Sequence, residues 1–123
     1  MRVFRNEARY LARKLDCRIV ATTPMYGEVN QLKLARGRFL SEMDQDLFQN
    51  VAVLGSRSAE SLFGFEDPID RAVKLNNHYY RVIGIMSNRT PSAGAGGSQA
   101  AEDFNEDIYI PISTCRARFG EMI

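Results

Sequence analysis

The apolar run from Val51 to Leu54 stops at a glycine and predicts a buried strand near the middle of the chain. Residues 56–64 follow with the pattern of a short helix. The apolar side chains of this helix fall at i, i+3 and i+4 and share one face: Ala59, Leu62 and Phe63. We expect Ser56 to accept a hydrogen bond from a free amide of the first turn, and Gly64 to end the helix as a left-handed residue.

A hairpin is predicted for residues 73–85, where two strand-like segments flank a pair of asparagines. Asparagine tolerates positive φ, so the pair suits a two-residue turn. Such a turn places Val73 opposite Tyr80. The second strand then carries apolar side chains on both faces, with Tyr80 and Val82 on one face and Tyr79, Ile83 and Ile85 on the other. We expect both faces to be at least partly covered.

Residues 3–15 are ambiguous, because their apolar positions fit a helical stripe and also the first arm of a hairpin. Helix propensity favours the stripe. Residues 17–23 are clearer, since they are rich in β-branched side chains and end at Pro24, which cannot donate to a strand ladder. The residues alone therefore leave the first element of the chain open.

Shorter patterns complete the predicted fold. They are a turn or single helical turn at 25–29, an alternating strand at 30–36 closed by Gly37, a capping box at 41–44, a short strand ending at Pro111 at an edge or an end, and a helix start capped by Ser113. Five aromatic residues beside apolar patterns are expected to pack in the core: Phe39, Phe48, Phe63, Phe65 and Tyr80. The predicted class is α+β and strand-rich, with hairpins in a mixed or antiparallel sheet and two or three short helices.

Composition and charge are those of one soluble globular domain, which we place at residues 1–123. Hydrophobic residues make up 45% of the chain and charged residues 25%, so the composition is not that of a disordered segment. No apolar run approaches the roughly 18 residues that span a bilayer. The net charge of +1 argues against a nucleic-acid partner.

The residues offer little catalytic or metal-binding chemistry. Calcium binding by acids at 42, 44 and 46 is the alternative to the capping box, but the loop lacks the glycine that such sites use. His78 is the only histidine and is expected at the surface, since it has no partners for a metal site or a triad. Cys17 and Cys115 allow either one disulfide or two buried thiols. We expect no catalytic residue, cofactor or metal.

Residues 87–107 predict a long flexible loop, because the segment is rich in glycine, serine and alanine. It does not form a phosphate cradle, since no Gly-Lys-Ser/Thr sequence follows. Loops of this length are often functional. We therefore expect it to contact a partner through its proline and glycine positions: Pro91, Gly94, Gly96 and Gly97.

A series of short motifs, in order and at their spacing, resembles the MacB-like periplasmic core domain of ABC transporter permeases in the MacB, LolC/LolE and FtsX-like group. The residues that carry the resemblance are Gly37, Arg38, Phe39, Val53, Gly55, Leu62, Phe63, Gly64, Asp67, Pro68, Gly84 and Pro111. The sequence departs from the pattern at Asp70 and Asn77, where the family commonly has glycine. Both residue types can adopt the required backbone at some energetic cost.

The resemblance implies that residues 7–10 and 17–23 form a hairpin, which overrides the helical stripe. It also implies a non-enzymatic domain at the periplasmic or extracytoplasmic face of the cell membrane, within a dimeric permease whose cytoplasmic ATPase supplies the energy. A periplasmic adaptor protein and an unidentified substrate are the expected partners. The chain would then be a segment cut from a larger domain between membrane helices. The alternatives are a free-standing extracytoplasmic binding or sensor domain and, less favoured, a small carboxylate-based enzyme.

Overall fold

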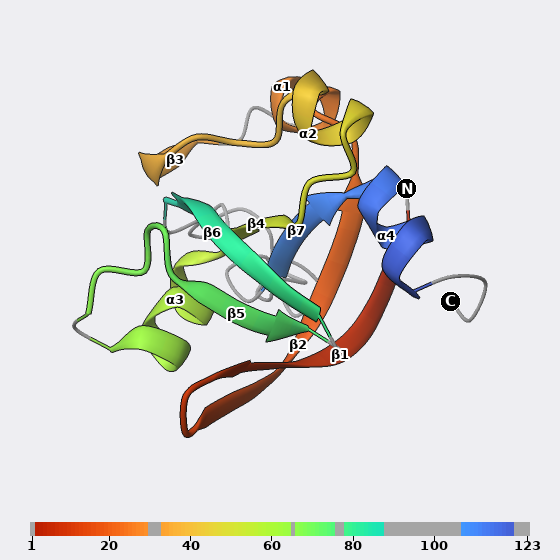
Figure 1. Cartoon of the computed structure of the whole chain (residues 1–123). Helices are drawn as coiled ribbons and strands as arrows, with labels where there is room; N and C mark the ends of the chain where they lie inside the picture. The colour runs from red at the N-terminus through yellow and green to blue at the C-terminus, as the bar shows by residue number, and fades with distance from the viewer. Residues whose placement is uncertain (1, 30–32, 65, 76–77, 88–106, 120–123) are drawn as a thin grey trace, which may run out of the picture.

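The computed structural model describes residues 2–29, 33–64, 66–75, 78–87 and 107–119 (Figure 1). Within these ranges the chain forms seven strands and four short helices, one helix more than the upper number expected. The elements are β1 Arg2–Tyr10, β2 Arg13–Thr22, α1 Met25–Val29, β3 Leu34–Gly37, α2 Glu42–Asp46, β4 Val51–Leu54, α3 Ser56–Phe63, β5 Ala72–Leu75, β6 His78–Met86, β7 Asp107–Pro111 and α4 Ile112–Phe119.

The strands form one mixed sheet that closes on itself. Their order is β3-β6-β4-β7-β2-β1-β5, and β5 pairs again with β6. The circuit therefore runs from β6 through β4, β7, β2, β1 and β5 back to β6, and β3 lies outside it against the end of β6. Two pairs are parallel, β2 with β7 and β4 with β6, and the other pairs are antiparallel. The α+β class and the mixed sheet are confirmed.

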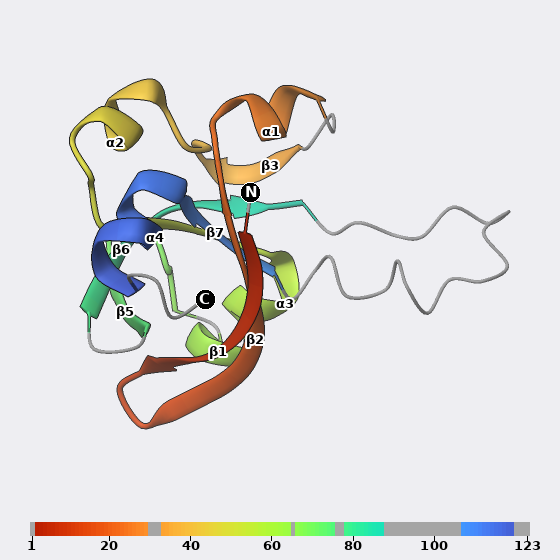
Figure 2. The ribbon, with the colours of Figure 1, turned by 90° about the vertical axis from the view of Figure 1, so that its right-hand side faces the viewer.

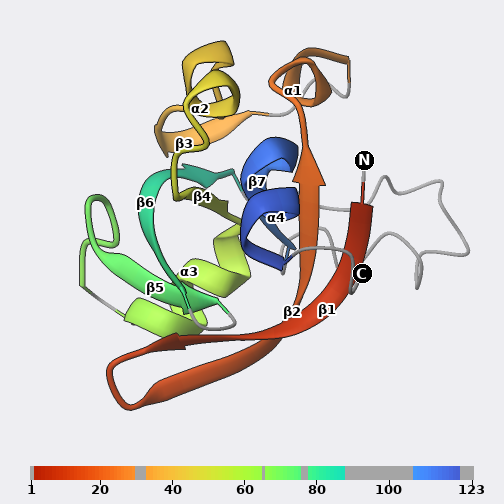
Figure 3. The same cartoon turned by 45° about the vertical axis from the view of Figure 1, so that its right-hand side comes forward.

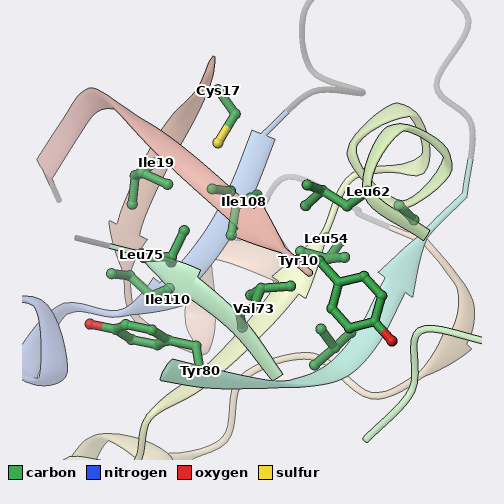
Figure 4. Close-up of a cluster of buried hydrophobic side chains, with 14 of the residues drawn as sticks. Tyr10, Cys17, Ile19, Leu54, Leu62, Val73, Leu75, Tyr80, Ile108 and Ile110 are labelled. Atoms are coloured by element: carbon green, nitrogen blue, oxygen red, sulfur yellow. The ribbon is translucent and has the colours of Figure 1, made fainter. Parts of the chain in front are cut away.

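The main core fills the inside of this circuit. Leu75, Tyr80 and Ile110 are fully buried there and point toward one another from three strands (Figure 4). The apolar face of α3 closes the core through Ala59, Leu62 and Phe63, as its spacing predicts. A second, smaller cluster lies on the other face of the sheet, with these buried members: Val20, Leu40, Val51, Val53, Ile83, Met86 and Tyr109. Tyr26, Leu34 and Phe39 pack against it.

The N-terminal segment is a hairpin and not a helix. β1 and β2 pair from Arg2 with Ala21 to Tyr10 with Arg13. The helical stripe was a wrong interpretation of an alternating pattern: Ala8 and Tyr10 are buried, while Arg9 between them is exposed. The hairpin implied by the family resemblance is confirmed.

The second hairpin has the predicted register, with Val73 opposite Tyr80. The prediction for the end of β6 was wrong, because a bulge interrupts the alternation. Ala52 pairs with Val82 and Val53 pairs with Gly84, which leaves Ile83 as the extra residue. Ile83 and Ile85 therefore face different clusters rather than sharing a face: Ile85 joins the main core and Ile83 the smaller one.

Two of the three predicted serine caps, those at Ser56 and Ser113, were wrong. The N-cap of α3 is Gly55, without a side-chain hydrogen bond, so Ser56 is already the first helical residue. Helix α4 begins at Ile112, directly after Pro111, and the hydroxyl of Ser113 donates instead to the Gln45 carbonyl oxygen at 2.6 Å. That bond ties α4 to α2.

Other local predictions had mixed outcomes. Gly64 has a positive φ of +62° at the end of α3, as expected, but its ψ of −117° lies outside the left-handed helical region. Pro111 lies at the end of β7, but β7 itself is an interior strand between β4 and β2. Asp70 has φ +69°, which is the backbone that a glycine in this position would adopt without strain. Phe48 is 48% exposed and not in the core, while Phe65 lies outside the described residues.

Candidate partner-binding surface

Two glycines far apart in the sequence pack backbone against backbone where β3 ends. Gly37 has φ +73°, and a Cβ on it would lie 2.2 Å from the Ile83 carbonyl oxygen. A Cβ on Gly84 would lie 2.2 Å from the Arg38 carbonyl oxygen. The Arg38 amide donates to the Ile83 oxygen at 3.0 Å. The contact accounts for both glycines and directs the chain from β3 toward α2.

The start of α2 is fixed by a capping box and an ion pair. The Asp44 amide donates to Ser41 Oγ at 3.3 Å, and the Ser41 amide donates to Asp44 Oδ2 at 2.9 Å. Arg38 donates through both terminal nitrogens to the same carboxylate, at 2.8 and 3.2 Å. The capping box is therefore confirmed. Of the three acids considered for calcium binding, at 42, 44 and 46, Asp44 is buried and ion-paired with Arg38.

Asp44 is charged at neutral pH because its partners outweigh its burial. Burial by itself raises the pKa of the carboxyl. The hydrogen bonds from Arg38 and Ser41 lower it further than burial raises it, so the net pKa lies below the usual value. The Arg38 side chain remains about half exposed, and the pair therefore holds α2 in place at the surface.

Helices α1 and α2 lie at the same end of the molecule (Figure 2), and several large apolar side chains on them and directly after α2 are exposed. We call this surface the helical end; its members are between 48% and 71% exposed: Met25, Val29, Met43, Leu47 and Phe48. Phe48 also has φ +54°, an unfavourable conformation for an aromatic residue. Exposed apolar groups gathered in one region are typical of a protein contact.

An open hollow of about 570 Å³ adjoins the helical end. Its lining is partly apolar and partly charged: Arg38, Ser41, Glu42, Met43, Asp44, Gln49, Val51 and Arg81. The exposed Met43 contributes to both the hollow and the helical end. The arrangement can receive a protruding side chain of a partner and offer it a cationic contact.

The described part of the chain holds no cluster of three or more histidine, cysteine, aspartate or glutamate side chains that could bind a metal ion. His78 is partly exposed, beside the turn as expected. Cys17 and Cys115 are free and buried, which decides between the two alternatives for the cysteines. None of the described helices is long and apolar enough to cross a membrane.

The motif residues of the family mainly build the fold. Val53, Leu62 and Phe63 are core residues, and Pro68 is buried. The Gly55 amide donates to the Asp107 carbonyl oxygen at 2.7 Å. The Asp67 carboxylate accepts hydrogen bonds from both terminal nitrogens of Arg36, at 2.6 and 3.0 Å, and from the Ile69 amide.

Arg38 links the motif to the helical end through its ion pair with Asp44, and the exposed apolar residues there were not recognised from the sequence. The spacing of these residues gave no sign of their exposure, because an apolar residue in or beside a short helix has the same sequence pattern as a core residue. The predicted partner-contact positions Pro91, Gly94, Gly96 and Gly97 lie outside the described residues.

Comparisons with known proteins define the class of this domain. It shares its fold with the extracellular domain of the noncanonic ABC-type transporter YknZ from Gram-positive bacteria, with a TM-score of 0.79 at 21% identity over 96% of this chain and 55% of that one. The periplasmic region of MacB from Actinobacillus actinomycetemcomitans gives a TM-score of 0.77 at 24% identity, over 94% and 48% of the two chains. The fold is that of an extracytoplasmic domain of ABC transporters.

The sequence then defines the family. The MacB-like periplasmic core domain family matches residues 1–123. The macrolide export ATP-binding/permease protein MacB of Bdellovibrio bacteriovorus is 32% identical over 117 residues, which are 94% of this chain and 17% of the relative. The pyoverdine export protein PvdT of Pseudomonas aeruginosa is 31% identical over 77% of this chain and 14% of its own length. The chain belongs to the MacB-like periplasmic core domains and is a periplasmic domain of an ABC transporter permease.

Proposed function

We propose that this domain couples the ATP-driven movement of its permease to the export of a substrate, without catalysing a reaction itself. The helical end is the observation that carries the proposal. Five exposed apolar side chains lie there on α1, on α2 and on the two residues that follow α2, and the Arg38–Asp44 pair fixes α2. A rigidly held apolar surface suits contact with an adaptor protein or with the substrate, because little conformational freedom is lost on binding.

The remaining partners follow from the relatives. The chain spans about a sixth of the length of the curated relatives it matches, and those relatives are named as ATP-binding/permease proteins. We therefore propose that a cytoplasmic ATPase drives this domain through membrane helices, that the whole protein is dimeric, and that its substrate is a small molecule such as the macrolides or pyoverdine for which the relatives are named.

The test uses cells that depend on the full-length permease, with macrolide accumulation as the readout. Charges introduced at the helical end by Met43→Glu and Leu47→Glu should raise accumulation several-fold, because a buried contact would have to desolvate two carboxylates. Val3→Glu is the matched control, since Val3 is similarly exposed on β1 and distant in sequence from both helices. Unchanged export by a folded double variant would contradict the proposal.

A second proposed contact is the segment 87–107. Both of its ends are held by described residues: the Ser87 amide donates to the Lys33 carbonyl oxygen at 2.9 Å, and Asp107 is bound by Arg18. Replacing residues 88–106 with a Gly-Ser segment of equal length should therefore leave folding intact and reduce transport. Normal transport by this variant would remove the segment from the mechanism while leaving the helical end untouched.

A further inference from the structure

The turn between β1 and β2 holds a large apolar side chain in a conformation that disfavours it. Tyr10 pairs with Arg13, so the turn has two central residues, and the first of them, Leu11, has φ +54°. Glycine is the usual residue at such a position, since a Cβ there crowds the backbone. The Leu11 side chain is also 81% exposed. Neither backbone energy nor burial explains a leucine here.

Three cations and a tyrosine form a line across four strands beside this turn. Arg9 on β1 lies directly opposite Lys14 on β2 and, on its other side, opposite Lys74 on β5. Lys74 lies opposite Tyr79 on β6, with its Nζ 5.9 Å from the centre of the ring. We call these four residues the cationic row. Like charges directly opposite each other weaken strand pairing, so fold stability does not account for this arrangement.

The row lies on the outward face of the sheet. Its neighbours along the strands, Ala8 and Leu75, are buried in the core, and Tyr79 is 63% exposed. Strands lie about 4.8 Å apart, so the row extends over about 14 Å. Two acids lie beside it on the same face, Glu7 on β1 and, opposite it, Asp16 on β2. Arg9 Nε donates to the Glu7 carboxylate at 2.8 Å, and Arg9 and then Lys14 hold the pKa of Glu7 below its usual value.

A hollow of about 620 Å³ adjoins the row. Three cations, one acid, one leucine and two tyrosines are among its lining residues: Arg9, Tyr10, Leu11, Asp70, Arg71, Ala72, Lys74 and Tyr79. The backbone of Asp70 and Arg71, which line the hollow, is held firmly. The Val82 amide donates to the Arg71 carbonyl oxygen and the Asp70 amide donates to the Val82 carbonyl oxygen, each at 2.8 Å. The hollow thus combines fixed positive charge with exposed apolar groups.

We propose that the cationic row and its hollow bind an acidic segment of a partner protein, and that Leu11 and Tyr79 contact an apolar side chain of that segment. The turn between β1 and β2, beside which the row lies, is at the opposite end of the molecule from α1 and α2 (Figure 3). The inference therefore names a second binding surface and does not depend on the export function proposed above.

The concave shape favours a protein segment over a membrane. A bilayer surface is broad and flat, whereas an extended segment can enter the hollow that Arg71 and Lys74 line. Asp70 also lines the hollow and would repel a uniformly anionic surface. An extended peptide can avoid Asp70, and its carboxylates can approach the cations one at a time.

The first experiment selects random displayed peptides of about twelve residues on the immobilised chain. The selected peptides should be enriched in aspartate and glutamate and should carry at least one large apolar residue. A fluorescein-labelled peptide from this selection should bind the chain in solution, and its affinity should fall as sodium chloride rises from about 50 to 300 mM. Replacing its acids with the corresponding amides should abolish binding.

The second experiment uses variants with matched controls. Lys14→Gln with Lys74→Gln should weaken peptide binding about fivefold or more. Lys33→Gln with Arg116→Gln removes two exposed cations elsewhere and should change it less than about twofold. Leu11→Gly should weaken binding while the urea midpoint stays unchanged or rises, because glycine suits the turn. If Leu11 served only the fold, Leu11→Gly would lower the urea midpoint and leave peptide binding unchanged. Leu11→Met should retain binding.

Three outcomes would overturn the proposal. The selected peptides could lack an acidic bias, or they could bind the Lys14/Lys74 variant as tightly as the parent chain. The third is binding to vesicles of equal phosphatidylglycerol and phosphatidylcholine that is lost in the Lys14/Lys74 variant, with no peptide binding, since that result would assign the row to a membrane. All of these measurements use binding to the chain in solution, so their outcome does not depend on the export assay.

Discussion

Gly37 and Gly84 are the two halves of one backbone contact: a Cβ on Gly37 would meet the Ile83 carbonyl group and the Gly84 Cα, and a Cβ on Gly84 would meet the backbone of Arg38. The contact joins β3 to β6 at the bulge, and it sets the direction in which the chain leaves for α2. The position of the helical end thus depends on two residues that carry no side chain.

Substitution of either glycine should destabilise the fold. Gly37→Ala combines a positive φ with a Cβ 2.2 Å from a carbonyl oxygen, and we expect a loss of at least about 2 kcal/mol in the free energy of unfolding. Gly84→Ala should behave similarly. Gly27→Ala is the control, because Gly27 has no positive φ and the atoms nearest to its Cβ belong to the Phe39 ring rather than to the backbone. Urea denaturation measures all three; equal losses would contradict the proposed role of the contact.

The Asp44 carboxylate should be the most sensitive group of α2. Asp44→Ala removes the capping box and the bond from Arg38, and we expect a loss of about 2–3 kcal/mol. Asp46→Ala, an exposed acid two residues along the same helix, should change stability by less than about 0.5 kcal/mol. Similar values for the two variants would show that the ion pair contributes nothing beyond surface charge.

The same carboxylate gives stability a pH dependence. The pKa of Asp44 is lower in the folded chain than its ordinary value, so its contribution is fully present above the unfolded pKa of about 3.9 and is lost as pH falls through the lower, folded pKa. Acid unfolding of Asp44→Asn should therefore be shallower than that of the parent chain in this range. Parallel curves would mean that other acids carry the acid sensitivity.

The buried pair of Arg18 and Asp107 should be worth more than the surface ion pairs. Asp107 is fully buried, and its carboxylate accepts hydrogen bonds from Nε and one terminal nitrogen of Arg18, each at 2.9 Å. Arg18→Met leaves the carboxylate without its guanidinium partner, and we expect a loss of about 3–5 kcal/mol. The double variant with Asp107→Asn should lose less than the sum of the single variants, as measured by a double-mutant cycle. Additive losses would argue against a direct pair.

The two thiols should be protected in the folded chain. Cys17 and Cys115 are free and fully buried, and burial raises the pKa of Cys115, which lowers the fraction of reactive thiolate. We expect slow reaction with a disulfide reagent under native conditions and rapid reaction of two thiols in urea. Failure to detect two thiols in urea without reductant would indicate a disulfide and contradict the structure.

Much of the local structure could be predicted from the sequence, because neighbouring residues decide it. The β5–β6 register follows from the short turn between Leu75 and His78, and the capping box of α2 involves residues three positions apart. The apolar spacing of α3 needs only one face of one helix. The resemblance to a family of permease domains likewise depended on short motifs, most of which are structural.

The features decided by the tertiary structure join residues that are distant in the sequence. The segment that became β1 fits helical and strand periods alike, and pairing with β2 over nine positions selects the strand. The bulge at Ile83 lies beside the contact between Gly37 and Gly84, and Arg18 meets Asp107 across 89 positions. Exposure of Leu11 or Leu47 also required the fold, because an apolar residue is placed in the core or at the surface only by what packs against it. The sequence by itself determined most of the elements and the family resemblance; the packing of distant segments selected the first strand and decided which surfaces remain open to a partner.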